Sequence, residues 1–388
     1  MKKLKIGDLC EILNGYAFKS DKYVKDGIRV IRITNVQKGF VEDEKPQFYP
    51  IAEINNVKDY MLEEDDLLVS LTGNVGRVAM LDRRYLPAAL NQRVACLRVK
   101  NIAVLKKYLY YSLLTKKFED DCIVAAKGIA QKNMSTEWLK KYEINIPLLT
   151  EQEDIIKVMD RLSAIICDRN KEIEALDKLI KSQFIEMFGD PVINPKKWKV
   201  KPLVEMGKCK NGMNFHYDDT GVEINCLGVG DFKDLSIINE TKCLPKVTLN
   251  EMPSEEYLLK DDDIVFVRSN GNKSLVGRSV AVYPHEVPTT FSGFCIRFRN
   301  EDNGIIVPYL LRVLKAESMR VKMAGRGANI QNLNQQILST LLIPIPPLEL
   351  QNEFAQFVKQ VDKLKFEVQK ALDDTQMMFD SLMNEYFG

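Results

Sequence analysis

Histidine and tryptophan are scarce in this sequence of 388 residues, which contains two of each. The two histidines, His216 and His285, lie far apart, and none of the eight cysteines belongs to a Cys-x-x-Cys pair. Zinc sites are usually built from such closely spaced pairs, so the sequence predicts no metal site. Catalysis by histidine as a general acid or base also lacks a candidate that recurs along the chain. We interpret the cysteines as reduced thiols, mostly in the core.

Long apolar runs and a strong charge of one sign are absent as well. No 18 consecutive residues are apolar, and the N-terminal stretch has no apolar segment of signal length, so we expect a cytoplasmic protein without a membrane partner. Lys and Arg total 55 against 54 Asp and Glu, and 45% of the residues are hydrophobic. This composition is typical of a globular chain, and its length allows two domains with full cores.

Motifs for nucleotide chemistry are missing too. The segment 271–274, GNKS, lacks the upstream glycine of a phosphate loop, and 228–230, GVG, lacks the third glycine of a dinucleotide fingerprint. We find no methyltransferase N/D-P-P-Y/F motif and no nuclease carboxylate–lysine set. Acidic clusters at 63–66 and 261–263 precede apolar runs, and we interpret them as solvated turns rather than metal sites. The sequence therefore predicts no catalytic residue and no cofactor.

What the sequence does contain is a duplication. The segment 144–190 recurs at an offset of 199 residues, which places Gln152 on Gln351 and the pair Phe188-Gly189 on Phe387-Gly388. Each copy lacks Pro and Gly between its leading prolines and its closing glycine, so each can form one uninterrupted helix of about 36 residues, or roughly 54 Å.

Apolar residues recur in both copies in two interleaved series with a period of seven, over five heptads. Such a 4-3 spacing indicates a narrow apolar seam that meets another helix as in a coiled coil. A plain hairpin or a dimerisation zipper would also fit, but two copies in one chain favour pairing with each other, antiparallel, as a ruler between two modules. The predicted pairing residues are Ile155, Met159, Leu162, Ile166, Ile173, Leu176, Ile180, Phe354, Val358, Val361, Val368, Leu372, Phe379 and Leu382.

Charge differs between the predicted modules and the predicted helices. Lys and Arg against Asp and Glu number 25 to 19 in residues 1–150 and 20 to 17 in 191–346, but 6 to 10 in 151–190 and 4 to 8 in 347–388. A positive surplus confined to the modules fits contact with phosphate, and acidic helices suit a protein partner. Solvated glutamate-rich helix faces would explain the second observation equally well.

Each module carries two polar loops at matching positions. The first follows a predicted strand, at 70–77 and 268–278, and the second, at 126–134 and 325–333, combines a cation, a glycine and amides. Lysine and arginine match phosphate and guanine, and glutamine and asparagine match adenine. A capped turn in which the amides satisfy local backbone remains an alternative. The candidate DNA-binding residues are Lys19, Arg32, Asn35, Asn74, Arg77, Lys127, Gln131, Asn133, Asn214, Arg268, Asn270, Lys273, Arg278, Arg326, Asn329 and Gln331.

The segments 146–152, IPLLTEQ, and 343–351, IPIPPLELQ, each followed by a long helix, closely resemble the specificity subunit of Type I restriction-modification systems, as does 182–190, SQFIEMFGD. The resemblance covers the whole chain. It implies a non-catalytic subunit that reads a bipartite site in double-stranded DNA, one half per module, and docks two DNA methyltransferase (modification) subunits and restriction subunits, which do the chemistry. The alternatives are a helical interaction scaffold, or the specificity half of a methyltransferase-only or Type IIG-like system.

The expected fold is α+β, with two α/β target-recognition domains alternating with two long helices in a pseudo-two-fold repeat. The expected boundaries are a first recognition domain at 1–145, a first helical region at 146–190, a second recognition domain at 191–342 and a second helical region at 343–388.

Overall fold

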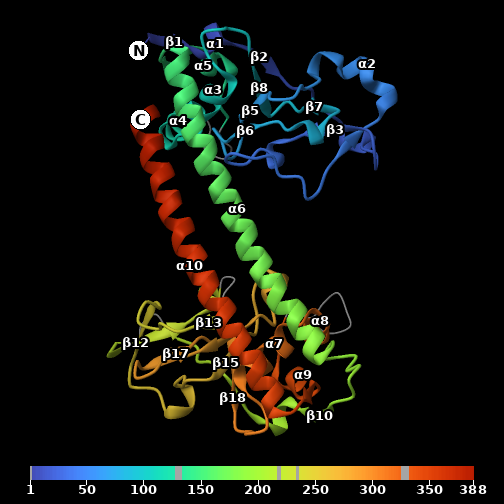
Figure 1. The fold of residues 1–388 in the computed structure, drawn as a ribbon, viewed down its shortest axis with the longest axis vertical. Helices are drawn as coiled ribbons and strands as arrows, with labels where there is room; N and C mark the ends of the chain where they lie inside the picture. The colour runs from blue at the N-terminus through green and yellow to red at the C-terminus, as the bar shows by residue number, and fades with distance from the viewer. Residues whose placement is uncertain (1, 127–132, 216–219, 233–235, 325–331) are drawn as a thin grey trace. The chain divides into compact units, whose positions relative to one another are not determined.

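The computed structural model divides the chain into two compact units, one formed by residues 1–171 with 369–388 and the other by residues 172–368. The structure describes residues 2–126, 133–215, 220–232, 236–324 and 332–388. Helices α6 (Leu149–Phe188) and α10 (Leu348–Phe387), green and red in Figure 1, each have 40 residues and contribute to both units. Each helix is slightly longer than predicted, about 60 Å at 1.5 Å per residue.

Unit 1 contains a two-stranded sheet β1-β9, a four-stranded sheet β2-β8-β5-β6 and a three-stranded sheet β4-β3-β7. Its strands are β1 (Lys2–Lys5), β2 (Cys10–Asn14), β3 (Ile28–Ile31), β4 (Phe48–Tyr49), β5 (Leu67–Ser70), β6 (Val78–Met80), β7 (Ala88–Leu90), β8 (Val94–Val99) and β9 (Glu143–Ile146). Its shorter α-helices are α1 (Ile6–Leu9), α2 (Ile54–Val57), α3 (Lys106–Leu113), α4 (Lys116–Ala125) and α5 (Thr136–Lys141).

Unit 2 contains a two-stranded sheet β10-β19, a five-stranded sheet β11-β18-β15-β16-β13 and a three-stranded sheet β14-β12-β17. Its strands are β10 (Lys199–Pro202), β11 (Gly207–Asn211), β12 (Val222–Leu227), β13 (Ile237–Ile238), β14 (Lys246–Leu249), β15 (Asp263–Val267), β16 (Ser279–Val282), β17 (Thr289–Phe291), β18 (Cys295–Asn300) and β19 (Leu342–Ile345). Its shorter α-helices are α7 (Val307–Lys315), α8 (Glu317–Ala324) and α9 (Gln335–Ser339).

The two units repeat the same topology. The order β2-β8-β5-β6 in unit 1 matches β11-β18-β15-β16 in unit 2, where β13 is added at the edge. The order β4-β3-β7 matches β14-β12-β17, with one antiparallel and one parallel pairing in each sheet. The duplication seen in the helical segments therefore extends through both strand-rich domains.

A buried glutamine ties each strand-rich domain to the long helix that follows it. Gln152, fully buried in the first turn of α6, accepts a hydrogen bond from the Leu105 amide (2.9 Å) and donates to the carbonyl oxygens of Ala103 (2.8 Å) and Pro147 (3.0 Å). Its counterpart in unit 2 is equally buried.

In that unit, Gln351 accepts from the Ile306 amide (3.0 Å) and donates to the carbonyl oxygens of Gly304 (3.0 Å) and Pro346 (2.8 Å). Buried amides are stable only when such partners are supplied. The matched glutamines noticed in the sequence thus fix the start of each helix on its own domain.

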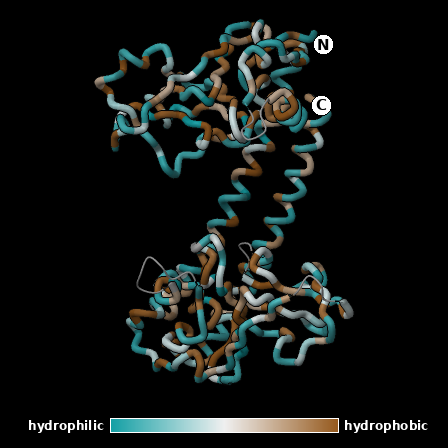
Figure 2. Tube along the Cα trace, turned by 180° about the vertical axis from the view of Figure 1, so that it is seen from behind, coloured by the Kyte–Doolittle hydropathy of each residue, from teal (hydrophilic) through white to brown (hydrophobic). Residues whose placement is uncertain are grey.

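The long helices pair antiparallel within each unit. In unit 1, Met159 near the start of α6 packs with Met383 and Phe379 near the end of α10. In unit 2, Ile180 near the end of α6 packs with Phe354 and Val358 near the start of α10. All the predicted pairing residues are buried or partly buried, and hydrophilic and hydrophobic residues alternate along both helices (Figure 2).

The last turn of each helix enters the core of the domain that belongs to the other copy of the repeat. In unit 1 the Phe387 ring of α10 lies 5.2 Å from the Tyr108 ring of α3, centroid to centroid. In unit 2 the Phe188 ring of α6 lies 4.7 Å from the Tyr309 ring of α7. Aromatic pairs at these distances are attractive beyond the area that they bury. This exchange explains why the C-terminal residues belong to the same unit as the N-terminus.

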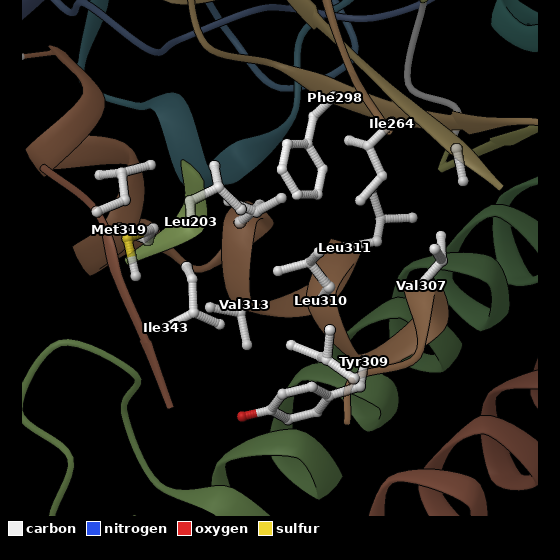
Figure 3. Close-up of a cluster of buried hydrophobic side chains, with 14 of the residues drawn as sticks. Leu203, Ile264, Phe298, Val307, Tyr309, Leu310, Leu311, Val313, Met319 and Ile343 are labelled. Carbon is white, nitrogen blue, oxygen red and sulfur yellow. The ribbon is translucent and has the colours of Figure 1, made fainter. Parts of the chain in front are cut away.

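The core of unit 2 lies between its five-stranded sheet, α7 and the paired helices. Ile264 and Phe298 point from the sheet toward Leu310 and Leu311 of α7, and Ile343 of β19 lies near Val313 of the same helix (Figure 3). Leu310 and Leu311 are almost fully buried because α7 presents apolar residues to both the sheet and the long helices. Unit 1 repeats this arrangement with α3 against β5 and β8.

The acidic clusters are not fully solvated turns, and this corrects our expectation. Asp66 and Asp263, the last acids before β5 and within β15, are 3% and 0% exposed. Arg98 binds Asp66 with two nitrogens (3.0 and 2.7 Å), and Arg299 binds Asp263 in the same way (2.8 and 2.7 Å). A buried carboxylate requires such a bidentate partner. The sequence showed the clusters but not the arginines on the neighbouring strands β8 and β18 that pair with them.

Candidate nucleic-acid interface

Backbone hydrogen bonds bring the two polar loops of unit 1 together at one edge of its sheet. The amide of Leu71, in the first loop, donates to the carbonyl of Arg93 in the β7–β8 turn (3.0 Å). The amide of Met134, at the end of the second loop, donates to the carbonyl of Leu71 (2.9 Å). Thr72 and Asn133 form a β-bridge, and the Thr72 hydroxyl donates to the Asn133 side-chain oxygen (3.3 Å). Two loops whose contacting residues Thr72 and Asn133 are 61 positions apart in sequence therefore share one surface.

Unit 2 joins its loops with the same bonds. The amide of Arg268 donates to the carbonyl of Phe294 in the β17–β18 turn, and the amide of Leu333 donates to the carbonyl of Arg268, both at 2.7 Å. Ser269 and Asn332 form the β-bridge that corresponds to Thr72 and Asn133.

An open groove of about 670 Å³ runs between these segments of unit 2. It is lined by Gly228, Val229, Ser269, Asn270, Gly271, Ser292, Phe294 and Asn332. Hydroxyl and amide groups beside accessible backbone are the chemistry that contacts base edges and phosphates. We call these joined loops, with the strand turns beside them, the loop edge of each unit.

A second segment of each unit reaches the loop edge through a glycine. A Cβ on Gly15 would lie 2.1 Å from the Asn91 carbonyl, and one on Gly212 would lie 2.1 Å from the Ser292 carbonyl oxygen. Each glycine follows an asparagine, a pair typical of tight turns, but neither has the positive φ that such a turn would demand. Glycine is needed because two backbones pass too closely for a side chain.

Comparison with known proteins assigns both halves of the chain to one family. Residues 1–175 and 195–375 each match the family described as Type I restriction modification DNA specificity domain. The chain belongs to this family of specificity subunits. Such subunits are the DNA-recognition components of restriction-modification complexes and are not enzymes themselves.

Similar specificity subunits and structures cover almost the whole chain. The MjaVIII specificity subunit of Methanocaldococcus jannaschii is 24% identical over 91% of this chain and 81% of its own length. The EcoBI specificity subunit of Escherichia coli is 21% identical over 99% of this chain and 85% of its own. The crystal structure of the S subunit from M. genitalium, 17% identical, superposes with a TM-score of 0.57 and covers 100% of this chain and 96% of its own. That structural likeness shows the shared fold.

The candidate DNA-binding residues of unit 1 differ in their surroundings. Asn133 and Asn74 are exposed on the two joined loops, and Lys19 is exposed just before a short 3-10 helix. Arg77 is partly buried, and its guanidinium bonds the Gln37 side-chain oxygen.

Two further candidates of unit 1 support the local backbone. The Asn35 side chain is buried, accepts from the Arg32 amide (2.9 Å) and donates to the Glu42 carbonyl (2.8 Å). The Arg32 side chain in turn donates to the Lys45 carbonyl (3.0 Å). Because Asn35 is buried and both its oxygen and its nitrogen bond the segment from 32 to 42, its amide is withheld from a base in this conformation.

In unit 2 the structure places four candidates on or next to the loop edge. Asn270 lines the groove, where its side-chain oxygen accepts from the Asn272 amide (2.7 Å). Arg268 donates to the Gly293 carbonyl (3.3 Å), and Asn214 is exposed beside that same glycine. Arg278 lies at the end of the first loop, two residues after Val276, and is partly buried.

The remaining candidates lie outside what the structure describes. They are Lys127, Gln131, Arg326, Asn329 and Gln331, together with the side chain of Lys273. Their role stays a prediction that rests on the sequence.

Sequence reasoning missed the strand turns that complete each loop edge. Gln92 and Arg93 are exposed in the turn between β7 and β8, and Phe294 is 62% exposed in the matching turn between β17 and β18. One signal could have found them. Arg93 and Phe294 each directly precede the apolar run of a central strand, where the chain passes from one sheet to another.

The described residues contain no group of three His, Cys, Asp or Glu side chains that could hold a metal ion. Burial raises the pKa of Cys10, Cys122 and Cys226 to about 12. Thiols with such pKa values stay protonated near neutral pH and are poor nucleophiles. Within the same ranges, no helix is long and apolar enough to cross a membrane.

One lysine of this specificity subunit has a pKa in the range that enzymes use. Burial, followed by repulsion from Arg312, lowers the pKa of Lys315 to about 8. Its ammonium group donates to the Ser236 hydroxyl (2.9 Å), near the ion pair between Lys365 and Asp177 (2.7 Å) on the long helices. Perturbed pKa values also arise in structural ion networks. Lys315 is the last residue of α7 and interacts with the charges of Arg312, Asp177 and Lys365, which makes it part of such a network.

Proposed function

We propose that each unit reads one half of a bipartite site in double-stranded DNA through its loop edge. One observation carries the proposal: both units join their two polar loops and a strand turn by the same hydrogen bonds, Met134 to Leu71 to Arg93 and Leu333 to Arg268 to Phe294. A structural connection alone does not require exposed amides at both matched positions. Asn133 and Asn332 are exposed there, and amide groups of this kind can distinguish base edges.

The long helices set the unread spacer between the two half-sites in this proposal. Each is continuous over 40 residues and is anchored at its start by a buried glutamine and at its end by a phenylalanine in an aromatic core. A helix fixed at both ends transmits a defined length. The protein then acts in the cytoplasm, where two modification subunits methylate the site that it selects and restriction subunits cleave DNA that lacks the methyl groups.

Methylation sequencing tests this function. Cells that express the cognate modification subunits with and without this chain are compared. The chain should cause methylation of a single motif with two specified halves separated by unspecified base pairs. Methylation without a defined motif, or of one continuous motif that has no unspecified spacer, would contradict the proposal.

A further inference from the structure

An aromatic ring stands exposed on the loop edge of unit 2. Phe294 is 62% exposed in the turn between β17 and β18 and lines the groove together with Ser269, Asn270 and Asn332. An apolar ring left in water forgoes the stabilisation that burial would give, and such residues often mark a binding surface. The ring is surrounded by hydrogen-bonding groups rather than by other exposed apolar side chains of the groove.

The backbone beneath this ring is held firmly. The Phe294 carbonyl accepts from the Arg268 amide (2.7 Å), and its amide donates to the Ser292 hydroxyl (3.3 Å). On either side, the Gly293 amide donates to the Met213 carbonyl (2.6 Å) and the Cys295 amide to the Ser292 carbonyl (2.8 Å). A ring with two side-chain torsions on a fixed backbone loses little conformational entropy when it contacts a ligand.

Two glycines beside the ring, Gly271 and Gly230, occupy positions where the fold itself would accept a larger residue. A Cβ on Gly271, which lines the groove, would have no atom within 4 Å, and the same holds for Gly230 next to the lining residue Val229. Neither has a positive φ. By contrast, a Cβ on Gly212 would collide with backbone at 2.1 Å. Glycine where the fold tolerates any residue indicates close approach of a ligand to the backbone.

We propose that Phe294 is a wedge that inserts against a base step of the half-site read by unit 2, while the glycines beside the groove admit the sugar-phosphate backbone. The inference rests on the proposed function. Apolar side chains inserted in this way partly unstack the duplex, and the cost is lowest at flexible pyrimidine–purine steps. Unit 2 therefore selects one step of its half-site by deformability, without a hydrogen bond to its bases.

Unit 1 reads its half-site differently at the matching position. There the turn carries Arg93, whose carbonyl accepts from Leu71 just as the Phe294 carbonyl accepts from Arg268. A guanidinium binds phosphate or guanine rather than unstacking a step. Wedge behaviour is thus expected in one half of the site alone.

The test uses the chain assembled with its modification subunits. It is mixed with unmethylated duplexes that contain the motif identified by methylation sequencing. The fluorescent base 2-aminopurine is placed at each position in turn, apart from the base that is methylated, because methyltransferases extrude their target base. The wild type should raise the fluorescence at one step of the half-site read by unit 2. Phe294→Ala should lose that signal and bind DNA about tenfold more weakly. Phe294→Trp should keep both the fluorescence signal and the wild-type affinity.

Two controls accompany the alanine variant. Phe366→Ala removes a ring of similar exposure (68%) from α10 and should leave the signal unchanged. A mismatch at the identified step lowers the unstacking cost and should restore part of the affinity of Phe294→Ala, which loss of a merely structural side chain would not predict.

Unchanged fluorescence and affinity in Phe294→Ala would overturn the wedge. Weakened association with the modification subunits, at unchanged DNA affinity of the assembled complex, would assign the ring to a protein interface and overturn it as well. Failure of the wedge is distinguishable from failure of the proposed function. If only the wedge fails, Asn332→Ala still relaxes the half-site read by unit 2.

Discussion

Replacing the buried glutamine of one helix should destabilise one unit and leave the other intact. Gln152→Leu introduces an apolar side chain of similar size and removes the partners of the Leu105 amide and the Ala103 and Pro147 carbonyls. Each buried group left without a partner costs about 1–3 kcal/mol. Carbonyls tolerate such a loss better than amides do, so we expect a total of about 4 kcal/mol. That is a large part of the stability of an ordinary domain.

Hydrogen exchange of the full chain, resolved by segment, measures this effect. Amides of α3, β1 and β9 in Gln152→Leu should exchange about a thousandfold faster, the equivalent of about 4 kcal/mol, while those of unit 2 stay at the wild-type rate. Gln351→Leu should show the reverse. Gln369→Leu provides the control, because that exposed amide bonds only Asp373 on the same helix (2.9 Å). A loss below about 1 kcal/mol, or equal acceleration in both units, would refute the anchoring role of the glutamines.

Three further outcomes follow from the same structure. Deleting one heptad from each long helix, 168–174 with 367–373, should shorten the spacer of the recognised site or abolish binding in gel shifts with a series of spacers, and an unchanged site would exclude the ruler. Lys127→Ala should weaken binding to all sequences alike and flatten its dependence on salt, whereas a sequence-dependent loss would make Lys127 a base reader. Stability in reducing buffer should be full below about pH 9 and fall as the pH rises toward 12, because burial raises the pKa of Cys10 and Cys226 to about 12 and only unfolded thiols ionise in that window. Each such thiol loses up to about 1.4 kcal/mol of stability per pH unit in this window. Lys315, whose pKa burial lowers to about 8, acts with the opposite sign up to about pH 10.5 but offsets only one thiol, so a flat denaturation profile between pH 9 and 10.5 would contradict this reasoning.

The repeated architecture was largely predictable because it depends on periodic patterns. The heptad spacing predicted two long helices, and the pairing residues lie in their buried or partly buried faces. The matched Gln152 and Gln351 were visible as a repeat, although their bonds to three backbone groups each were not. Burial of a helix face leaves a periodic trace in the sequence, whereas a tertiary hydrogen bond leaves none.

The loop edge was predictable only in part. The polar loops were found from composition, but asparagines that look alike in the sequence have different roles: some are exposed, and others are buried and bond the backbone. Asn133 is exposed, whereas Asn35 is buried between Arg32 and Glu42. Phe294 escaped notice because a lone phenylalanine before a strand is usually interpreted as core. Whether such a side chain is exposed or buried depends on which distant segments pack against it, so local sequence does not determine it.

Reading of one half-site by each unit is tested most directly by the matched asparagines Asn133 and Asn332. Methylation sequencing is carried out on cells whose modification subunits are paired with Asn133→Ala, with Asn332→Ala or with both. Each single variant should relax the specificity of one half of the motif, a different half for each, at about 1–3 kcal/mol, and the double variant should relax both additively. Relaxation of the same half by both variants, or weaker methylation of an unaltered motif in each, would contradict the account.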